Sequence, residues 1–273
     1  MPASAFALAL AAAFIHALWN LLIARARDPE AATAVALIVA VVAFAPITPF
    51  LWRVESAAWP YIAGTSAFHL LYFGLLAAAY RRAELSVVYP IARGVAPVLI
   101  LVVGVAALGV ATSAGQAAGV LLVGAGVLLV RGLKGHADRV GVLLGLGTAV
   151  TIAGYTLIDN QGVEHANPIA YLELTTAFAG LVYAAGVFAA KGAPALRREV
   201  NAHTVVAGLA MFGAYALVLA ALQLAAAAPV AAVREASIVI ATAGAALFLK
   251  ERFGPARMVG AVLVVLGIAL LGL

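Results

Sequence analysis

The feature that most constrains this chain is a succession of ten apolar segments, each about as long as a membrane-spanning helix. An α-helix rises about 1.5 Å per residue, so about 20 residues cross the roughly 30 Å hydrocarbon core of a bilayer. The expected helices cover residues 4–24, 32–52, 59–80, 86–108, 114–131, 141–159, 168–190, 202–222, 228–249 and 255–272. Short connections with proline, glycine and charged residues separate them, and Pro29, Pro168 and Pro255 are expected at helix starts. The pattern predicts an all-α, polytopic membrane protein.

Composition excludes an ordinary soluble domain. Hydrophobic residues make up 66% of the chain and charged residues 10%, with a mean hydropathy of +1.13, whereas soluble domains are roughly 25% charged. The chain contains no cysteine, which excludes disulfides, thiolate metal sites and a cysteine nucleophile. A net charge of +5 would suit an anionic partner, but nearly all basic residues lie in the connections. We therefore expect a lipid bilayer around the chain and no nucleic-acid partner.

The basic residues are unevenly distributed between the two sides of the expected bundle. The even connections and the termini hold only Arg53. The odd connections hold 13 basic residues: Arg25, Arg27, Arg81, Arg82, Arg131, Lys134, Arg139, Lys191, Arg197, Arg198, Lys250, Arg252 and Arg257. Because positively charged connections stay in the cytoplasm, both termini are expected outside it, with the chain in the inner or plasma membrane of a bacterium.

The two halves of the sequence look like copies of each other. An ungapped shift of 141 residues aligns identical residues, among them Arg93 with Arg234, Val98 with Val239, Leu108 with Leu249, Gly119 with Gly260, and Gly126 with Gly267. Five helices is an odd number, so the second copy must enter the membrane inverted. We expect one repeat in residues 1–135 and an inverted repeat in 136–273, with a substrate site near the bilayer midplane between them.

Two short motifs accompany the repeat. The first is the HALWN box at residues 16–20, and the second is the ending KERFG at 250–254, followed by Gly260 and Gly267. Over essentially its whole length the chain resembles the EamA branch of the drug/metabolite transporter superfamily. The resemblance implies export or exchange of small metabolites, such as amino acids, sugars or nucleotide derivatives, without ATP or a cofactor.

The chain departs from that family pattern in two places. Val110 occupies the position that matches Glu251, so the glutamate of the ending motif is present only in the second half. The basic residues also lie opposite to where the many family members with cytoplasmic termini would carry them.

Arg93 and Arg234 are the strongest candidates for a binding site. An arginine within an apolar membrane segment costs from about 3 to more than 10 kcal/mol unless it faces water, a partner or a ligand. One arginine per repeat could present a cationic fork to a carboxylate or phosphate. The alternative is that each lies about 10 Å from its helix start and extends to the interface. Glu235 is a candidate partner of Arg93, either as a protonatable coupling element or as a structural ion pair.

Several polar and aromatic residues are further substrate-binding candidates. They are His16, Trp19 and Asn20 in the first segment, His69 and Tyr72 in the third, Tyr89 in the fourth and Glu173 in the seventh, with weaker claims for Tyr155, Tyr183 and Tyr215. The alternatives are interhelical hydrogen bonds and, for Trp19, an interfacial aromatic anchor. Asp159 and Gln223 are expected to be helix caps or surface groups.

Proline and glycine also predict local structure. Pro90 and Pro97 are expected to kink the helix that carries Arg93, because each removes a backbone hydrogen bond. Gly115 with Gly119, and Gly141 with Gly145, have the GxxxG spacing that favours close helix packing.

The leading hypothesis is a secondary transporter, an exporter or exchanger of a small anionic or zwitterionic metabolite such as an amino acid. Alternating access would move the two repeats about the central site, with protons as a candidate coupling ion and the chain as a monomer or homodimer. A flippase of a lipid-linked sugar is the alternative within the same superfamily. A membrane-embedded enzyme would need paired catalytic groups, which the sequence does not display; no catalytic residue, metal site or cofactor is expected.

Overall fold

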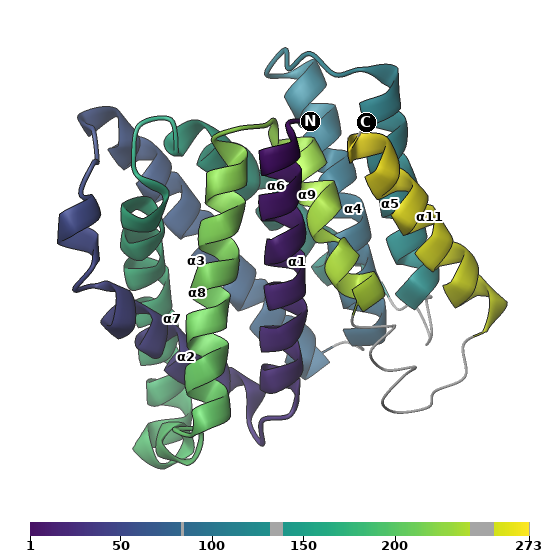
Figure 1. Ribbon diagram of the computed structural model, residues 1–273. Coiled ribbons are helices and arrows are strands. Elements are labelled where there is room, and N and C mark those ends of the chain that lie inside the picture. Colours follow the sequence, from purple (N-terminus) through teal and green to yellow (C-terminus); the bar gives the residue numbers. More distant parts are fainter. Residues whose placement is uncertain (83–84, 132–138, 241–253, 273) are drawn as a thin grey trace.

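The computed structural model describes residues 1–82, 85–131, 139–240 and 254–272, which form a bundle of helices (Figure 1). The first half contributes α1 (Ala3–Ala24), α2 (Pro29–Phe44), α3 (Trp59–Arg82), α4 (Leu85–Ala106) and α5 (Ala114–Arg131), with short 3-10 turns η1 (Thr48–Leu51) and η2 (Ser56–Ala58). The second half contributes α6 (Arg139–Gly162), α7 (Pro168–Arg198), α8 (Ala202–Leu222), α9 (Ala227–Arg234) and α11 (Pro255–Gly272).

Six helices within the described ranges are long and apolar enough to cross a membrane. They lie in α1, α4, α6, α7, α8 and α11. The starts expected at Pro29, Pro168 and Pro255 are confirmed, since each proline is the first residue of its helix. Asp28 and Asn167 cap the first two of these helices by accepting hydrogen bonds from backbone N–H groups.

One expected helix end was wrong. The segment expected to reach residue 52 ends at Phe44, because the prolines at 46 and 49 lack the N–H that a helix interior needs. The helix expected to end at 190 breaks at Gly192, which has a non-helical conformation with φ 75°, and a second helical stretch continues to Arg198. In the ninth segment α9 ends at Arg234, and residues 236–240 are helical again. Residues 241–249 of that segment lie outside the described ranges.

The five helices of the first half, α1 to α5, correspond in order to α6, α7, α8, α9 and α11 of the second half. Exchanging each helix for its counterpart reproduces the same contacts between the halves, as a twofold axis requires. Helix α1 packs against α8 and α9, while its counterpart α6 packs against α3 and α4. Helix α2 packs against its counterpart α7, and α5 packs against its counterpart α11. The inverted two-repeat architecture expected from the sequence is therefore confirmed.

The contact between α5 and α11 depends on the four glycines that the internal repeat aligns. A Cβ atom at Gly126 would lie 2.7 Å from the carbonyl oxygen of Gly260, and one at Gly119 would lie 2.9 Å from that of Gly267. Since the lower number on one helix pairs with the higher on the other, the helices run antiparallel. Of the pairs expected from GxxxG spacing, Gly119 and Gly145 make close contacts, whereas the nearest atom to a Cβ at Gly115 is Ser113 Oγ at 3.9 Å, an ordinary contact within its own segment.

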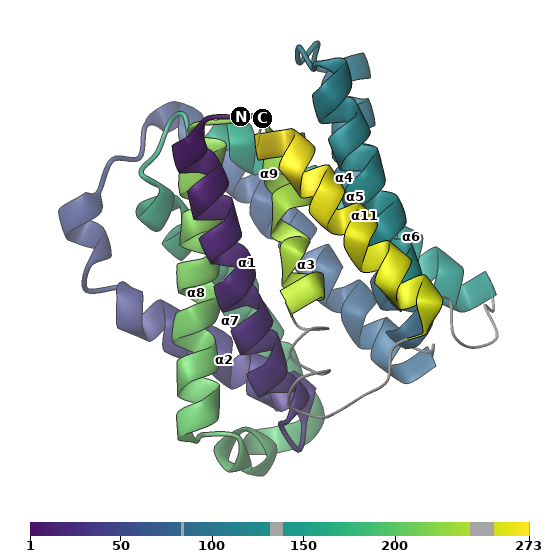
Figure 2. The same ribbon diagram turned by 45° about the vertical axis from the view of Figure 1, so that its right-hand side comes forward.

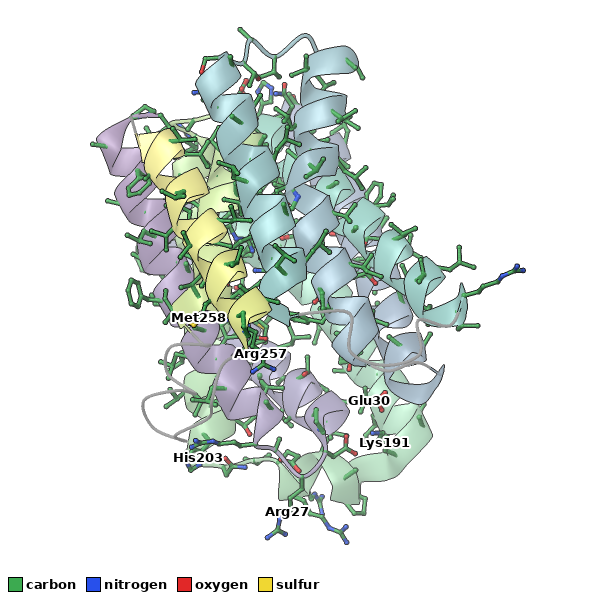
Figure 3. All side chains as sticks on the ribbon, turned by 90° about the vertical axis from the view of Figure 1, so that its right-hand side faces the viewer. Arg27, Glu30, Lys191, His203, Arg257 and Met258 are labelled. Atoms are coloured by element: carbon green, nitrogen blue, oxygen red, sulfur yellow. The ribbon has the colours of Figure 1, made fainter. Side chains whose placement is uncertain are left out.

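The two ends of the chain lie side by side at one end of the bundle (Figures 1 and 2). The Met1 ammonium donates to the Leu271 carbonyl oxygen at 3.2 Å. Arg27, Glu30, Lys191 and His203 lie together at the lower end of Figure 3, where Lys191 Nζ forms ion pairs with Asp28 at 2.7 Å and Glu30 at 2.6 Å. The bundle thus has a charged end and a termini end, and these two names are used below.

Candidate functional site: a cavity between the repeats

A cavity of about 830 Å³ lies between the two halves of the bundle. Its volume is within the range of ordinary small-molecule pockets, about 300–1,000 Å³. Nine of the candidates from the first, third, fourth and ninth expected segments line it: His16, Trp19, Asn20, His69, Tyr72, Tyr89, Pro90, Arg93 and Arg234. They come from α1, α3, α4 and α9, so four helices from both repeats carry these polar and aromatic side chains to one cavity.

Arg93 and Glu235 join the two repeats at this cavity. The Arg93 Nε atom donates to Glu235 Oε2 at 3.0 Å, and the two side chains are 9% and 6% exposed. The ion pair expected from the sequence is therefore present. The Nη2 atom of Arg93 is buried and has no hydrogen-bond partner among the described residues, so within these ranges the guanidinium retains an unsatisfied donor group at the cavity.

Arg234 is held differently from Arg93. Its guanidinium carbon lies 5.3 Å from the centre of the Tyr215 ring, a distance at which a cation and an aromatic face attract each other. Within the described part of the chain its side chain forms no hydrogen bond or ion pair, although the residue is only 7% exposed. Among the described residues, no carboxylate therefore forms an ion pair with Arg234.

The described lining of the cavity is positively charged. Arg257, at the start of α11, joins Arg93 and Arg234 in the lining, whereas no aspartate or glutamate is among the described lining residues. Glu235 offsets one of the three charges through its contact with Arg93. The arrangement favours an anionic or zwitterionic ligand with a carboxylate or phosphate group.

Aromatic rings form one wall of the cavity. The His69 ring lies 4.4 Å from that of Tyr155 in a stacked arrangement and 5.9 Å from that of Tyr215 edge to face. In α1, the Trp19 ring contacts the His16 ring edge to face at 4.8 Å. These rings offer apolar and hydrogen-bonding surface beside the arginines.

Asp159 is a correction to the sequence analysis, which expected a cap or surface group. The residue is fully buried, and its carboxylate accepts hydrogen bonds from the hydroxyl groups of Thr65 at 2.5 Å, Tyr171 at 3.0 Å and Tyr215 at 2.5 Å. Thr65 belongs to the first repeat and the two tyrosines to the second. The hydrogen bonds therefore link the two repeats at the termini end. Tyr215 also contacts Arg234 through its ring. The spacing of Asp159 one turn after Tyr155 was the signal that could have revealed this inward face.

Of the other residues considered in the sequence analysis, some line the cavity and others do not. Gln223 is exposed at the end of α8, as expected, and its Nε2 donates to the Val163 carbonyl oxygen at 2.7 Å. Tyr155 and Tyr215 line the cavity, whereas Tyr183 packs against Phe73 instead. Pro97 does not line it.

Helix α4 continues without interruption through both of its internal prolines. The kink expected at Pro90 and Pro97 stays a prediction.

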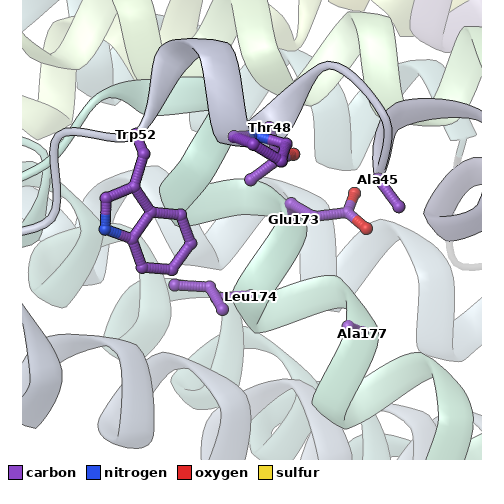
Figure 4. A pocket seen from close by; sticks show the side chains of 7 residues that line it. Ala45, Thr48, Trp52, Glu173, Leu174 and Ala177 are labelled. Carbon is purple, nitrogen blue, oxygen red and sulfur yellow. The ribbon is translucent and has the colours of Figure 1, made fainter.

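Glu173 lies outside the central cavity. It lines a separate pocket with Ala45, Thr48, Pro49, Trp52, Leu174 and Ala177 (Figure 4). The neighbouring positions Leu172 and Thr175 do line the central cavity, because successive residues of a helix point in different directions. Glu173 and the arginines therefore cannot bind one ligand in the described arrangement.

Four cavity threonines were missed by the sequence analysis: Thr33, Thr148, Thr175 and Thr176. The first three hydroxyls donate to carbonyl oxygens one turn earlier in their own helices. Such bonds are routine for threonine in apolar helices, so the sequence gives no sign that distinguishes these positions.

The cavity extends toward the charged end of the bundle. Its lining includes Ala24 and Pro29, at the end of α1 and the start of α2, and Arg257 at the start of α11. Toward the termini end of the bundle, the lining residue Phe212 stacks on Phe44 with ring centres 3.9 Å apart. The Asp159 network also lies toward the termini end. No metal-ligating group of three or more histidine, aspartate or glutamate residues occurs in the ranges described.

The fold and the cavity define a class, a polytopic helical membrane protein of two inverted repeats with a polar chamber between them. The comparisons with known proteins agree. The EamA-like transporter family matches residues 3–132 and 139–273. The chain therefore belongs to the EamA-like transporter family, whose members are membrane transporters of the drug/metabolite type and not enzymes.

A solved structure shares the fold. It is described as the crystal structure of a protein, with a TM-score of 0.75 and 17% sequence identity over 99% of this chain and 98% of that one. At this identity the likeness shows the fold alone. No curated protein matches the chain.

Proposed function

We propose that this chain is a secondary transporter of a small anionic or zwitterionic metabolite, and that Arg234 and the unsatisfied edge of Arg93 bind its carboxylate or phosphate group. The observation that carries the proposal is that two arginines, 141 positions apart in the internal repeat, line one cavity, and that Glu235 is the described carboxylate paired with one of them, Arg93. His16, Trp19, Asn20, His69, Tyr72 and Tyr89 would contact the rest of the substrate. An amino acid fits this description, with its carboxylate on the arginines and its side chain against the aromatic wall.

Transport would proceed by alternating access of the repeats in residues 1–135 and 136–273. The Asp159 network and the Phe44–Phe212 stack close the termini end, while the cavity lining reaches the charged end. In the change to the oppositely open state, Thr65 would separate from Asp159 at the termini end, and the helices at the charged end would approach one another. With the charged end in the cytoplasm, as the basic connections predict, this arrangement would load substrate from the cytoplasm and release it outside.

The cavity volume favours a small metabolite over a lipid-linked sugar, the alternative within the superfamily. Protons are the proposed coupling ion, and Glu235 is the titratable group placed to respond to them, because it bonds to a site arginine.

The test is uptake of labelled amino acids and other small organic anions by the purified full chain in proteoliposomes, with and without a pH gradient. We expect saturable uptake that the gradient stimulates. Arg234→Ala should raise KM by about 10- to 100-fold, because a hydrogen bond to a charged group contributes about 1.5–3 kcal/mol. Arg234→Lys should recover part of the loss.

Arg197→Ala is the matched control, since Arg197 is exposed at the charged end and lies outside the cavity lining. Unchanged KM in Arg234→Ala, with transport otherwise intact, would contradict the proposed site. Transport of organic cations but not anions would contradict the proposed substrate class.

A further inference from the structure

The second pocket, which holds Glu173, has a composition that suits a cationic group. Its volume is about 670 Å³, and it is formed where the end of α2 and the turn η1 meet the first turns of α7. Figure 4 shows the Glu173 carboxylate below Thr48 and directed toward Ala45, with the Trp52 ring across the pocket. Apart from Glu173 and Thr48, the lining is apolar or aromatic.

Glu173 is the feature of this pocket that needs a partner. The residue is 6% exposed, its Oε2 atom is buried, and its carboxyl forms no hydrogen bond within the described ranges. A buried ionised carboxylate without donors is strongly unfavourable. A ligand that supplies N–H donors and a positive charge would remove that cost.

Two further groups in the pocket also attract a cation. Helix α2 ends at Phe44 with no basic residue in its last turn, so the negative end of its macrodipole faces the pocket at Ala45. The Thr48 hydroxyl donates to the Phe44 carbonyl oxygen at 3.1 Å, which leaves its oxygen lone pairs free to accept a hydrogen bond. Trp52 adds an aromatic ring of the kind that binds ammonium groups.

The position of the pocket indicates that it lies near the membrane surface. Glu173 is five residues into α7, about 8 Å from the helix start by helical rise. Trp52 and Trp59 are about half exposed nearby in the sequence, and Phe50 is 88% exposed; such aromatic residues are enriched at the level of lipid headgroups. Arg53, directly after Trp52, is exposed and is the lone basic residue that the connections on this side were found to carry.

We propose that this pocket binds the protonated amine of an aminophospholipid headgroup, such as that of phosphatidylethanolamine, from the leaflet at the termini end. The ammonium group donates to Glu173 and Thr48, the phosphate remains at the surface beside Arg53, and the acyl chains lie along the exposed apolar faces of α2 and α7. The bound lipid contacts α2 and α7, and both helices also line the transport cavity. Lipid binding is therefore coupled to the conformation of the central site.

The experiment is native mass spectrometry of the full chain in neutral detergent, titrated with dioleoyl phosphatidylethanolamine, phosphatidylcholine or phosphatidylglycerol. Phosphatidylcholine has the same chains and phosphate but a quaternary nitrogen without N–H donors. We expect phosphatidylethanolamine to be retained severalfold better than either other lipid. Glu173→Gln should abolish that preference, and Ala177→Leu, which narrows the pocket but keeps the carboxylate, should reduce it.

Glu164→Gln is the matched control, because Glu164 is an exposed carboxylate at the same end of the bundle; the preference should persist in it. Thermal unfolding of each variant checks folding, and removing an unpaired buried charge at Glu173 should not destabilise the protein. Equal retention of phosphatidylethanolamine and phosphatidylcholine, or a preference that survives Glu173→Gln, would overturn the proposal. Butylammonium binding without any lipid preference would also overturn it, in favour of a free amine as the ligand.

Discussion

The buried ion pair between Arg93 and Glu235 leads to a prediction about stability. Arg93→Ala removes the guanidinium that lies 3.0 Å from the Glu235 carboxylate, and Glu235 is only 4% exposed. Breaking one member of a buried pair typically costs about 3–5 kcal/mol, because the other charge remains buried. We expect a clear loss of thermal stability in detergent for Arg93→Ala. The double variant Arg93→Ala/Glu235→Ala should recover most of it; equal destabilisation in both would show that packing, and not charge, stabilises this region.

A second residue-scale prediction concerns Asp28 at the charged end. Burial alone would raise the pKa of the Asp28 carboxyl, but hydrogen bonds from Lys191 and from the N–H groups of Ala31 and Glu30 outweigh it and lower the pKa below its usual value. A carboxyl with a lowered folded-state pKa stabilises the fold above its unfolded pKa of about 3.9, and this contribution is lost as pH falls through the folded-state pKa.

Asp28→Asn keeps a capping side chain but removes the ion pair. At pH 7 we expect its Tm to be lower than that of the unaltered chain by up to about 3 °C, since partly exposed pairs contribute little. The difference should shrink below about pH 4, where the carboxylate becomes protonated. Thermal unfolding at the two pH values measures this, and a difference that grows on acidification would refute it.

The polar residues of the cavity could be predicted because ionisable and amide side chains are rare in apolar segments. Arg93, Arg234 and His69 were conspicuous for that reason. Asp159 was misread because its position near a helix end is shared with ordinary caps, and its partners Thr65, Tyr171 and Tyr215 come together only in the folded bundle. Glu173, expected to bind substrate, lies in another pocket, because the rotation of its helix is not specified by a single sequence.

At the scale of elements, the contact between α5 and α11 predicts an unequal response to the same substitution. A Cβ at Gly126 would lie 2.7 Å from the Gly260 carbonyl oxygen, whereas nothing lies within 4 Å of a Cβ at Gly186. We expect Gly126→Ala to destabilise the protein by about 1–3 kcal/mol through overpacking. Gly186→Ala should be neutral or stabilise it by up to about 1 kcal/mol, because alanine favours helix. Equal effects in thermal unfolding would argue against close helix contact.

Helix existence was predictable from hydropathy, but helix ends were less so. Starts followed proline at 29, 168 and 255 because proline suits a first helical turn. The interruption of α9 at Glu235 has no such marker, since neither proline nor glycine stands there. Glu235 at this point pairs with Arg93 on α4, a tertiary contact that the local sequence does not reveal.

For the whole molecule, the open question that the sequence raises is orientation in the membrane. The chain has no cysteine, so a single introduced cysteine can be labelled without background. On intact bacterial cells a membrane-impermeant maleimide should label Glu164→Cys at the termini end. It should label Arg197→Cys, at the charged end, only after the cells are lysed. The reverse pattern would place both termini in the cytoplasm and reverse the proposed direction of transport.

The Arg93–Glu235 pair also makes the chamber unsymmetrical. Under the shift of 141 residues Glu235 falls on Gly94, where a Cβ would lie 2.9 Å from Leu128 Cγ and 3.0 Å from the Gly124 carbonyl oxygen. A matching acid therefore has no room in the first half. A chamber with perfect twofold symmetry would admit a cargo molecule in two equivalent poses, head to tail or tail to head. With Glu235 on one side and glycine at the matching position, this chamber should distinguish the two ends of its cargo and admit it in a single pose.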